Sequence, residues 1–235
     1  HDRPMNRSAC LIYNPTSGQG DSVEELVTIR KILESQIDLD IRPLLDKTIG
    51  AAGIVQEALE RGAEAIVAAG GDGTVSAVAQ AVIGTGIPLG VIPRGTANAF
   101  ATAIGIPSEI PTACQTILAG VTRPVDVAKC NGKPMLLLTG IGFEAETIER
   151  ASSMKDTFGK LAYILAGIGQ LRHLDAFTAW IETEDRRLNL PASAVTVANA
   201  APPTSVLAQG TTGVFADDGL LDITIVAPNS RLQAI

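Results

Sequence analysis

The sequence contains few of the residues on which several common kinds of site depend. Of its 235 residues only two are histidine and three are cysteine, and aromatic residues make up 3%. The scarcity of histidine disfavours a zinc-dependent mechanism. An odd number of cysteines without a CxxC pair is typical of free thiols in a reducing cytosol. An acidic balance, with 18 Lys and Arg against 25 Asp and Glu, disfavours nucleic-acid binding when aromatic residues are also scarce.

Long apolar segments are missing as well. The longest runs, such as residues 161–169, fall well short of the roughly 18 residues that span a bilayer. The first residues, His1 to Pro4, carry no apolar segment of the kind found in signal peptides. With 46% hydrophobic residues, the composition predicts a soluble, acidic, cytoplasmic protein of one large or two small domains.

Segments typical of strands and helices alternate through the first half of the chain. Apolar runs predict strands at 9–13, 39–45, 65–69 and 89–92. Helical spacing predicts helices at 23–33, 49–61, 75–83 and 97–104. Ser22 and Glu25 have the spacing of a capping box at the start of the first helix. This alternation predicts an α/β fold with a parallel sheet and helices on both of its faces.

The pattern changes after about residue 120. Strands are predicted at 125–130, 135–139, 176–182, 194–198 and 221–226, and one helix at 154–174 interrupts them. Trp180, inside one of these strands, is expected in the core. The chain is therefore expected to consist of a nucleotide-binding α/β domain, residues 1–123, and a β-rich domain, residues 124–235.

Three of the four strand-to-helix junctions are rich in glycine: residues 14–20, 70–74 and 93–98. Ligands of a parallel sheet bind beyond the carboxyl ends of its strands. Glycine lets the backbone approach a phosphate, and the helix that follows offers free N–H groups. One such loop can be an ordinary tight turn, but three on one sheet edge favour a phosphate site. Because GxxxxGK[ST] and a complete GxGxxG are both missing, the sequence excludes a P-loop and disfavours a Rossmann dinucleotide site.

Two charged residues lie in these loops. Asp72 would repel phosphate unless it holds Mg²⁺ or accepts a proton from an incoming hydroxyl. The alternative is that it caps the helix expected from Val75. Arg94 has a donor fork that suits phosphate, and the alternative is a solvated loop residue.

The three loops together resemble the diacylglycerol kinase catalytic domain family, which includes soluble bacterial lipid kinases and the sphingosine and ceramide kinases and is related to NAD kinase. The resemblance is carried by Asn14-Pro15-x-Ser17-Gly18, Gly70-Gly71-Asp72-Gly73-Thr74 and Pro93-x-Gly95-Thr96-Ala97-Asn98. Gly140 to Ala145 and Asp217 to Asp222 extend it over nearly the whole chain.

The resemblance implies an ATP- and Mg²⁺-dependent lipid kinase that transfers the γ-phosphoryl group to a lipid hydroxyl, that of diacylglycerol. It implies that the second domain is a β-sandwich, that ATP binds between the domains, and that Asp72 is catalytic. Asp218 and the Leu220 carbonyl would hold Mg²⁺. The residues expected at the nucleotide are Asn14, Ser17, Gly18, Gly70, Gly71, Gly73, Thr74, Arg94, Gly95, Thr96 and Asn98.

Three departures from the family pattern stand beside this resemblance. Ala99 and Glu144 replace aspartates, and the chain ends at Ile235, so it is expected to be truncated at its C-terminal end and poorly active. The alternatives are a kinase for a soluble acceptor, as in NAD kinase, and a nucleotide- or lipid-binding module without turnover. The expected partner is a lipid at the membrane surface, reached transiently from the cytoplasm, and an uncovered sheet edge would allow a homodimer.

Overall fold

The computed structural model describes residues 7–18, 20–45, 50–142, 176–209 and 213–228. The chain divides into two compact units, residues 1–126 and 127–235, and each is described by itself. The predicted helix at 154–174 and Glu144 lie outside the described residues. Within those residues, no helix combines the length and the apolar character that crossing a membrane requires.

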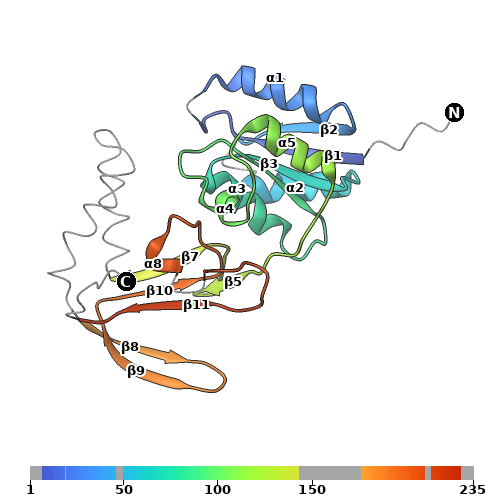
Figure 1. The fold of residues 1–235 in the computed structure, drawn as a ribbon. Helices are drawn as coiled ribbons and strands as arrows, with labels where there is room; N and C mark the ends of the chain where they lie inside the picture. The colour runs from blue at the N-terminus through green and yellow to red at the C-terminus, as the bar shows by residue number, and fades with distance from the viewer. Residues whose placement is uncertain (1–6, 19, 46–49, 143–175, 210–212, 229–235) are drawn as a thin grey trace. The chain divides into compact units, whose positions relative to one another are not determined.

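The first unit is built on a parallel sheet of four strands in the order β2-β1-β3-β4 (Figure 1). Its strands are β1 (Arg7–Tyr13), β2 (Ile37–Pro43), β3 (Ala65–Gly70) and β4 (Leu89–Pro93). The central strands β1 and β3 are almost completely buried, which explains their continuous apolar sequence. The predicted parallel sheet is confirmed.

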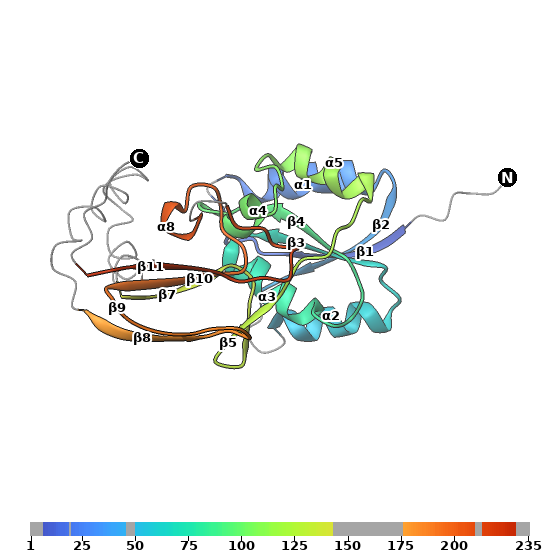
Figure 2. The same cartoon turned by 60° about the horizontal axis from the view of Figure 1, so that its bottom comes forward.

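Helices cover both faces of this sheet, as predicted. They are α1 (Ser22–Leu33), α2 (Gly50–Glu60), α3 (Asp72–Val82), α4 (Ala99–Ala103) and α5 (Ile110–Ala119). Helices α1 and α5 pack together on one face, and α2 and α3 on the other (Figure 2). Helix α5 was not predicted, although Pro111 in its first turn and Gly120 at its end, with φ 68°, are ordinary helix boundaries.

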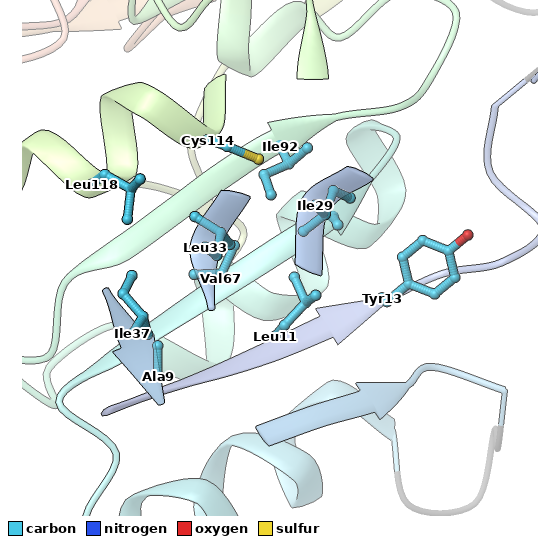
Figure 3. Packing of buried hydrophobic residues seen from close by; sticks show 11 residues of the cluster. Ala9, Leu11, Tyr13, Ile29, Leu33, Ile37, Val67, Ile92, Cys114 and Leu118 are labelled. Carbon is cyan, nitrogen blue, oxygen red and sulfur yellow. The ribbon is translucent and has the colours of Figure 1, made fainter. Parts of the chain in front are cut away.

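The core of the first unit lies between the sheet and the helix pair α1 and α5 (Figure 3). Ile29 and Leu33 of α1 and Cys114 of α5 are completely buried against the strands. Burial raises the pKa of the Cys114 thiol to about 11, and that of Cys10 in β1 to about 11 as well. Both cysteines are free, as expected, and at neutral pH they act as small apolar side chains.

The second unit contains antiparallel strands, which confirms the expected β-rich domain. Strands β11, β10 and β7 form one sheet in that order, and two hairpins accompany it. The bounds are β5 (Ala128–Cys130), β6 (Lys133–Met135), β7 (Leu138–Gly142), β8 (Phe177–Glu182), β9 (Arg187–Ala192), β10 (Ala194–Ala198), β11 (Asp222–Val226) and a short helix α8 (Val206–Gln209). The strand predicted at 135–139 is thus divided between β6 and β7, and β9, which has no apolar run, was not predicted.

Trp180 does not lie in the core, and the prediction that it would is wrong. Its strand β8 forms a hairpin with β9, and one face of this hairpin packs on apolar side chains. Phe177 and Ala179 point to a small apolar cluster with Ala192 and Val195. Side chains alternate along a strand, so Trp180 points the other way and is 79% exposed.

Candidate functional site

The three glycine-rich loops meet at one edge of the first unit's sheet. Strand β1 lies between β2 and β3, so the chain order reverses between the carboxyl ends of β1 and β3. Such a switch point is where open parallel sheets bind ligands. Backbone hydrogen bonds join the loops there: Asn14 N donates to Ala69 O at 3.0 Å, and Arg94 N donates to Gly70 O at 2.9 Å. The prediction that the loops share one edge is confirmed.

The loop after β1 is organised by the side chain of Asn14. Its Oδ1 atom accepts hydrogen bonds from Thr16 N at 3.0 Å and Thr16 Oγ1 at 2.8 Å. Its Nδ2 atom donates to the buried Thr74 Oγ1 at 3.0 Å. Asn14 therefore fixes its own loop and ties it to the first turn of α3. Ser17 and Gly18 continue this loop, with Ser17 N donating to Asn14 O at 3.2 Å.

The second loop is shorter than predicted, because α3 begins at Asp72 rather than at Val75. Gly71 is its N-cap and offers no side-chain cap. The backbone N–H groups of Asp72, Gly73 and Thr74 find no hydrogen-bond acceptor among the described residues. Gly73 is exposed, and a Cβ atom added to it would meet nothing within 4 Å. The helix thus begins with free donors beside open space.

Asp72 caps a helix, but not the one expected from the sequence. Its Oδ1 atom accepts a hydrogen bond from Phe100 N, at 3.2 Å, in the first turn of α4. Because Asp72 is itself the first residue of α3, the alternative that it caps α3 is wrong. Its other oxygen makes no hydrogen bond within the described part of the chain. The carboxylate therefore supports α4 with one oxygen and keeps the second for another partner.

The third loop is held by Asn98, which adopts φ 47°, in the left-handed region. Its Oδ1 atom accepts from Gly95 N at 2.7 Å, and its Nδ2 atom donates to Gly95 O at 2.8 Å. A Cβ atom on Gly95 would lie 2.7 Å from the Cα atom of Gly71. These two glycines are therefore required where the second and third loops touch. Thr96, which lies between Gly95 and Asn98 in the chain, is exposed.

Arg94 is buried, so the alternative that it is a solvated loop residue is wrong. Its Nε atom donates to Glu25 Oε2 at 2.6 Å, its Nη1 atom donates to Asn14 O at 2.6 Å, and its Nη2 atom forms an ion pair with Glu25. The guanidinium carbon lies 4.4 Å from the centre of the Tyr13 ring. Two nitrogens of the fork expected at a phosphate thus donate hydrogen bonds within the protein, while the buried Nη2 makes none within the described residues.

Glu25 also corrects the prediction of a capping box. Asp21, not Ser22, is the N-cap of α1, and its Oδ1 atom accepts from Val23 N at 2.8 Å. Ser22 is already the first helical residue. Glu25 is therefore free of a capping role and reaches across to Arg94, 69 residues further along the chain. The sequence pattern was compatible with a capping role for Glu25 and with an ion pair to Arg94, and nothing in it indicated the ion pair.

The residues expected at Mg²⁺ lie in the second unit. Asp218 Oδ1 accepts a hydrogen bond from Leu220 N at 2.9 Å, and Gly219 between them has φ 74°. The pair forms a tight turn in which the second carboxylate oxygen and the Leu220 carbonyl belong to the donor type that suits a hard cation. Over the described ranges, no three His, Cys, Asp or Glu side chains gather as a metal site would require. Asp218 and Leu220 remain a prediction.

Two family models match the chain. Residues 8–130 match the diacylglycerol kinase catalytic domain, and residues 138–235 match the YegS C-terminal NAD kinase beta sandwich-like domain. The first match contains all three glycine-rich loops.

Individual relatives agree with these matches. An uncharacterized protein of Synechocystis sp. is 50% identical over 236 residues, which cover 96% of this chain and 54% of the relative. A diacylglycerol kinase of Bacillus subtilis is 34% identical over 227 residues, which cover 94% of this chain and 74% of that enzyme. The crystal structure of a diacylglycerol kinase from Bacillus anthracis has a TM-score of 0.76 and 29% identity, and the alignment covers 97% of this chain and 76% of that one. The chain therefore spans between 54% and 76% of the length of these three relatives.

Proposed function

The chain belongs to the diacylglycerol kinase catalytic domain family, and from this premise we propose that it is part of an ATP-dependent lipid kinase whose acceptor is the free hydroxyl of diacylglycerol. The observation that carries the proposal is the first turn of α3. Its three N–H groups have no acceptor among the described residues, and within the same turn Gly73 is exposed, with nothing within 4 Å of a Cβ atom added to it.

This turn has the chemistry of a phosphate site. A helix N-terminus combines unpaired donors with the positive end of the helix dipole, and both favour an anion. The sheet's switch point places the loops after β1 and β4 beside it. Asn14, Gly71, Thr74, Gly95 and Asn98 build the rim of this site in the proposal, while Ser17, Gly18, Gly70 and Thr96 extend it.

Asp72 is the group that we assign to the reaction. A carboxylate next to bound phosphates would weaken binding unless its charge is used. In the proposed reaction the oxygen of Asp72 that does not bind Phe100 N accepts the proton of the attacking lipid hydroxyl or holds the cation that accompanies ATP. The oxygen bound to Phe100 N keeps the carboxylate oriented in either role.

Mg²⁺ enters the proposal as the usual partner of ATP, where it neutralises charge on the phosphates. Asp218 and the carbonyl of Leu220 are the residues that we propose to hold a cation in the second unit. The turn that they form already fixes Asp218 through Leu220 N. The substitution Asp218→Asn is expected to reduce the increase in phosphoryl-transfer rate that added Mg²⁺ produces.

The acceptor is proposed to lie at a membrane surface, which the protein would visit from the cytoplasm. The net charge of −7 opposes attraction to anionic lipids. Apolar contact or Mg²⁺ would therefore have to supply the attraction, and binding is expected to rise with Mg²⁺ rather than with the anionic lipid content alone. The proposal also allows two copies of the chain to pair through their sheet edges as a homodimer.

Phosphoryl transfer from radiolabelled ATP tests the function. The protein is offered diacylglycerol in neutral phosphatidylcholine vesicles in one reaction and NAD in another, each with Mg²⁺. Label in the lipid alone, at a low rate, is the expected result. Label in NAD alone would overturn the lipid assignment in favour of a soluble acceptor, a reading to which the NAD kinase-like description of the second domain gives weight. Label in neither, with ATP bound in calorimetry, would reduce the protein to a binding module.

A further inference from the structure

An ion pair between a buried arginine and a partly buried glutamate connects the elements around the proposed phosphate site. The side chain of Arg94 is 0% exposed and that of Glu25 is 23% exposed. Arg94 follows β4, and Glu25 lies in the first turn of α1. Nη1 of Arg94 also donates to the carbonyl of Asn14, directly after β1. One guanidinium thus joins the loop after β1, the helix α1 and the loop after β4.

The backbone of Arg94 extends this connection to the second loop. Arg94 N donates to Gly70 O at 2.9 Å. The carbonyl oxygen of Arg94 would lie 2.9 Å from a Cβ atom on Gly18, whose φ is 97°. Asn14, which Arg94 holds by its carbonyl, binds Thr74 in the first turn of α3. The position of that turn relative to its neighbours therefore depends on Arg94.

The same contacts keep Arg94 away from a ligand. Nε donates to Glu25 and Nη1 donates to Asn14 O, and the aromatic ring of Tyr13 lies against the face of the guanidinium. Nη2 lies against Glu25 as part of the ion pair but makes no hydrogen bond within the described residues, and it is buried, so a ligand cannot reach it without a shift of the loops. Its charge is balanced by Glu25. Burying two charges costs solvation free energy, and a buried pair is in general a weak source of stability. A role in fixing one arrangement of the loops accounts for the pair better than a role in stability.

We propose that Arg94 and Glu25 are positioning residues, which hold the loops after β1 and β4 so that the first turn of α3 stays open to phosphate, and that Arg94 does not itself bind the phosphate. This proposal rests on the proposed function, since it concerns the same site. It departs from the sequence-based expectation that the guanidinium contacts the nucleotide.

The charge of Glu25 makes the two roles separable. The substitution Glu25→Gln keeps the length of the side chain and removes a negative charge near an anionic ligand. If Arg94 bound phosphate directly, this change would release the guanidinium and tighten ATP binding. If the pair positions the loops, the change weakens ATP binding although the electrostatics alone would favour it. The substitution Arg94→Lys keeps the charge and loses the planar fork.

The experiment measures the dissociation constant of Mg²⁺·ATP by calorimetry for the parent and for E25Q, R94K and the double variant. We expect each single variant to bind at least about tenfold more weakly, within the range that small misplacements cost. The double variant should be no weaker than the weaker single variant, because both changes break one pair. E34Q is the matched control, since Glu34 ends the same helix α1 and pairs with the exposed Arg30. E34Q should bind ATP like the parent.

A tighter or unchanged dissociation constant in E25Q would overturn the proposal. A second measurement, amide hydrogen exchange without nucleotide, applies even if the parent binds no ATP, in which case the proposed function fails by itself. The positioning role predicts faster exchange of the Ser17 and Arg94 amides in E25Q and R94K than in E34Q. Equal exchange of these amides in all variants would contradict the proposal, whatever the affinity for ATP.

Discussion

The carboxylate of Asp72 and the backbone N–H of Phe100 are joined by a hydrogen bond of 3.2 Å. The bond connects the first residue of α3 with the first turn of α4. It means that Asp72 has a structural role and, in our proposal, a chemical one, carried by different oxygens of one side chain. Substitutions at this position can separate the two roles.

The substitution Asp72→Asn keeps an oxygen for Phe100 N and removes the charge. Turnover should fall by at least about 10²-fold, the scale of a general base, while the melting temperature stays near that of the parent. Asp72→Ala also removes the cap and should lower the free energy of unfolding by about 1 kcal/mol. Thermal melting and initial rates of phosphoryl transfer check both. Parental turnover in Asp72→Asn would leave Asp72 with the capping role alone.

Gly73 is predicted to matter for the ligand and not for the fold. An added Cβ atom would meet nothing within 4 Å, and the residue lies in the first turn of α3. Gly73→Ala should therefore leave stability unchanged or raise it by up to about 1 kcal/mol, because glycine is a poor helix former. The same Cβ would stand where the phosphate is proposed, so affinity for ATP should fall. Chemical denaturation and calorimetry measure the two effects, and undiminished affinity would remove Gly73 from the site.

Gly95 is the matched contrast. A Cβ atom there would lie 2.7 Å from the Cα atom of Gly71 and 2.9 Å from Oδ1 of Asn98. Backbone atoms would have to move, so Gly95→Ala should lower the free energy of unfolding by about 1–3 kcal/mol, as overpacking does. A denaturation midpoint equal to that of the parent would show that the loops after β3 and β4 do not touch as described.

The buried thiols predict a decline of stability at alkaline pH. Burial raises the pKa of Cys10 and of Cys114 from 9.0 to about 11 in the folded protein. Between these values the unfolded chain has released more thiol protons than the folded one, so stability falls as the pH rises from about 9 to about 11. Melting temperatures across this window should decline less in a Cys10→Ala, Cys114→Ala double variant. Parallel declines in both proteins would contradict the assignment.

The strands and the meeting of the loops could be predicted because their signals are local. Apolar runs mark β1 and β3, and glycines mark the junctions that follow them. The contacts that organise the site are not local. Glu25 and Arg94 are 69 residues apart, and Asp72 and Phe100 are 28 apart. In each case a nearer partner was chemically acceptable, so the sequence pointed to a capping box at Ser22 and to a cap on α3.

Exposure in the second unit was equally hard to predict. Trp180 occupies a strand of alternating side chains, but its large apolar ring favours burial by composition alone. The packing of Ala179 against Ala192 and Val195 decides which face of β8 is covered. Trp180, the neighbour of Ala179 in the strand and the partner of Asn189, takes the opposite face.

A crystal structure of the protein with Mg²⁺ and a non-hydrolysable ATP analogue would show whether the first turn of α3 binds phosphate. We expect phosphate oxygens to accept hydrogen bonds from the backbone N–H groups of Asp72, Gly73 and Thr74, with the ion pair between Arg94 and Glu25 intact. Phosphates bound elsewhere, with the first turn of α3 left without a ligand, would contradict this expectation.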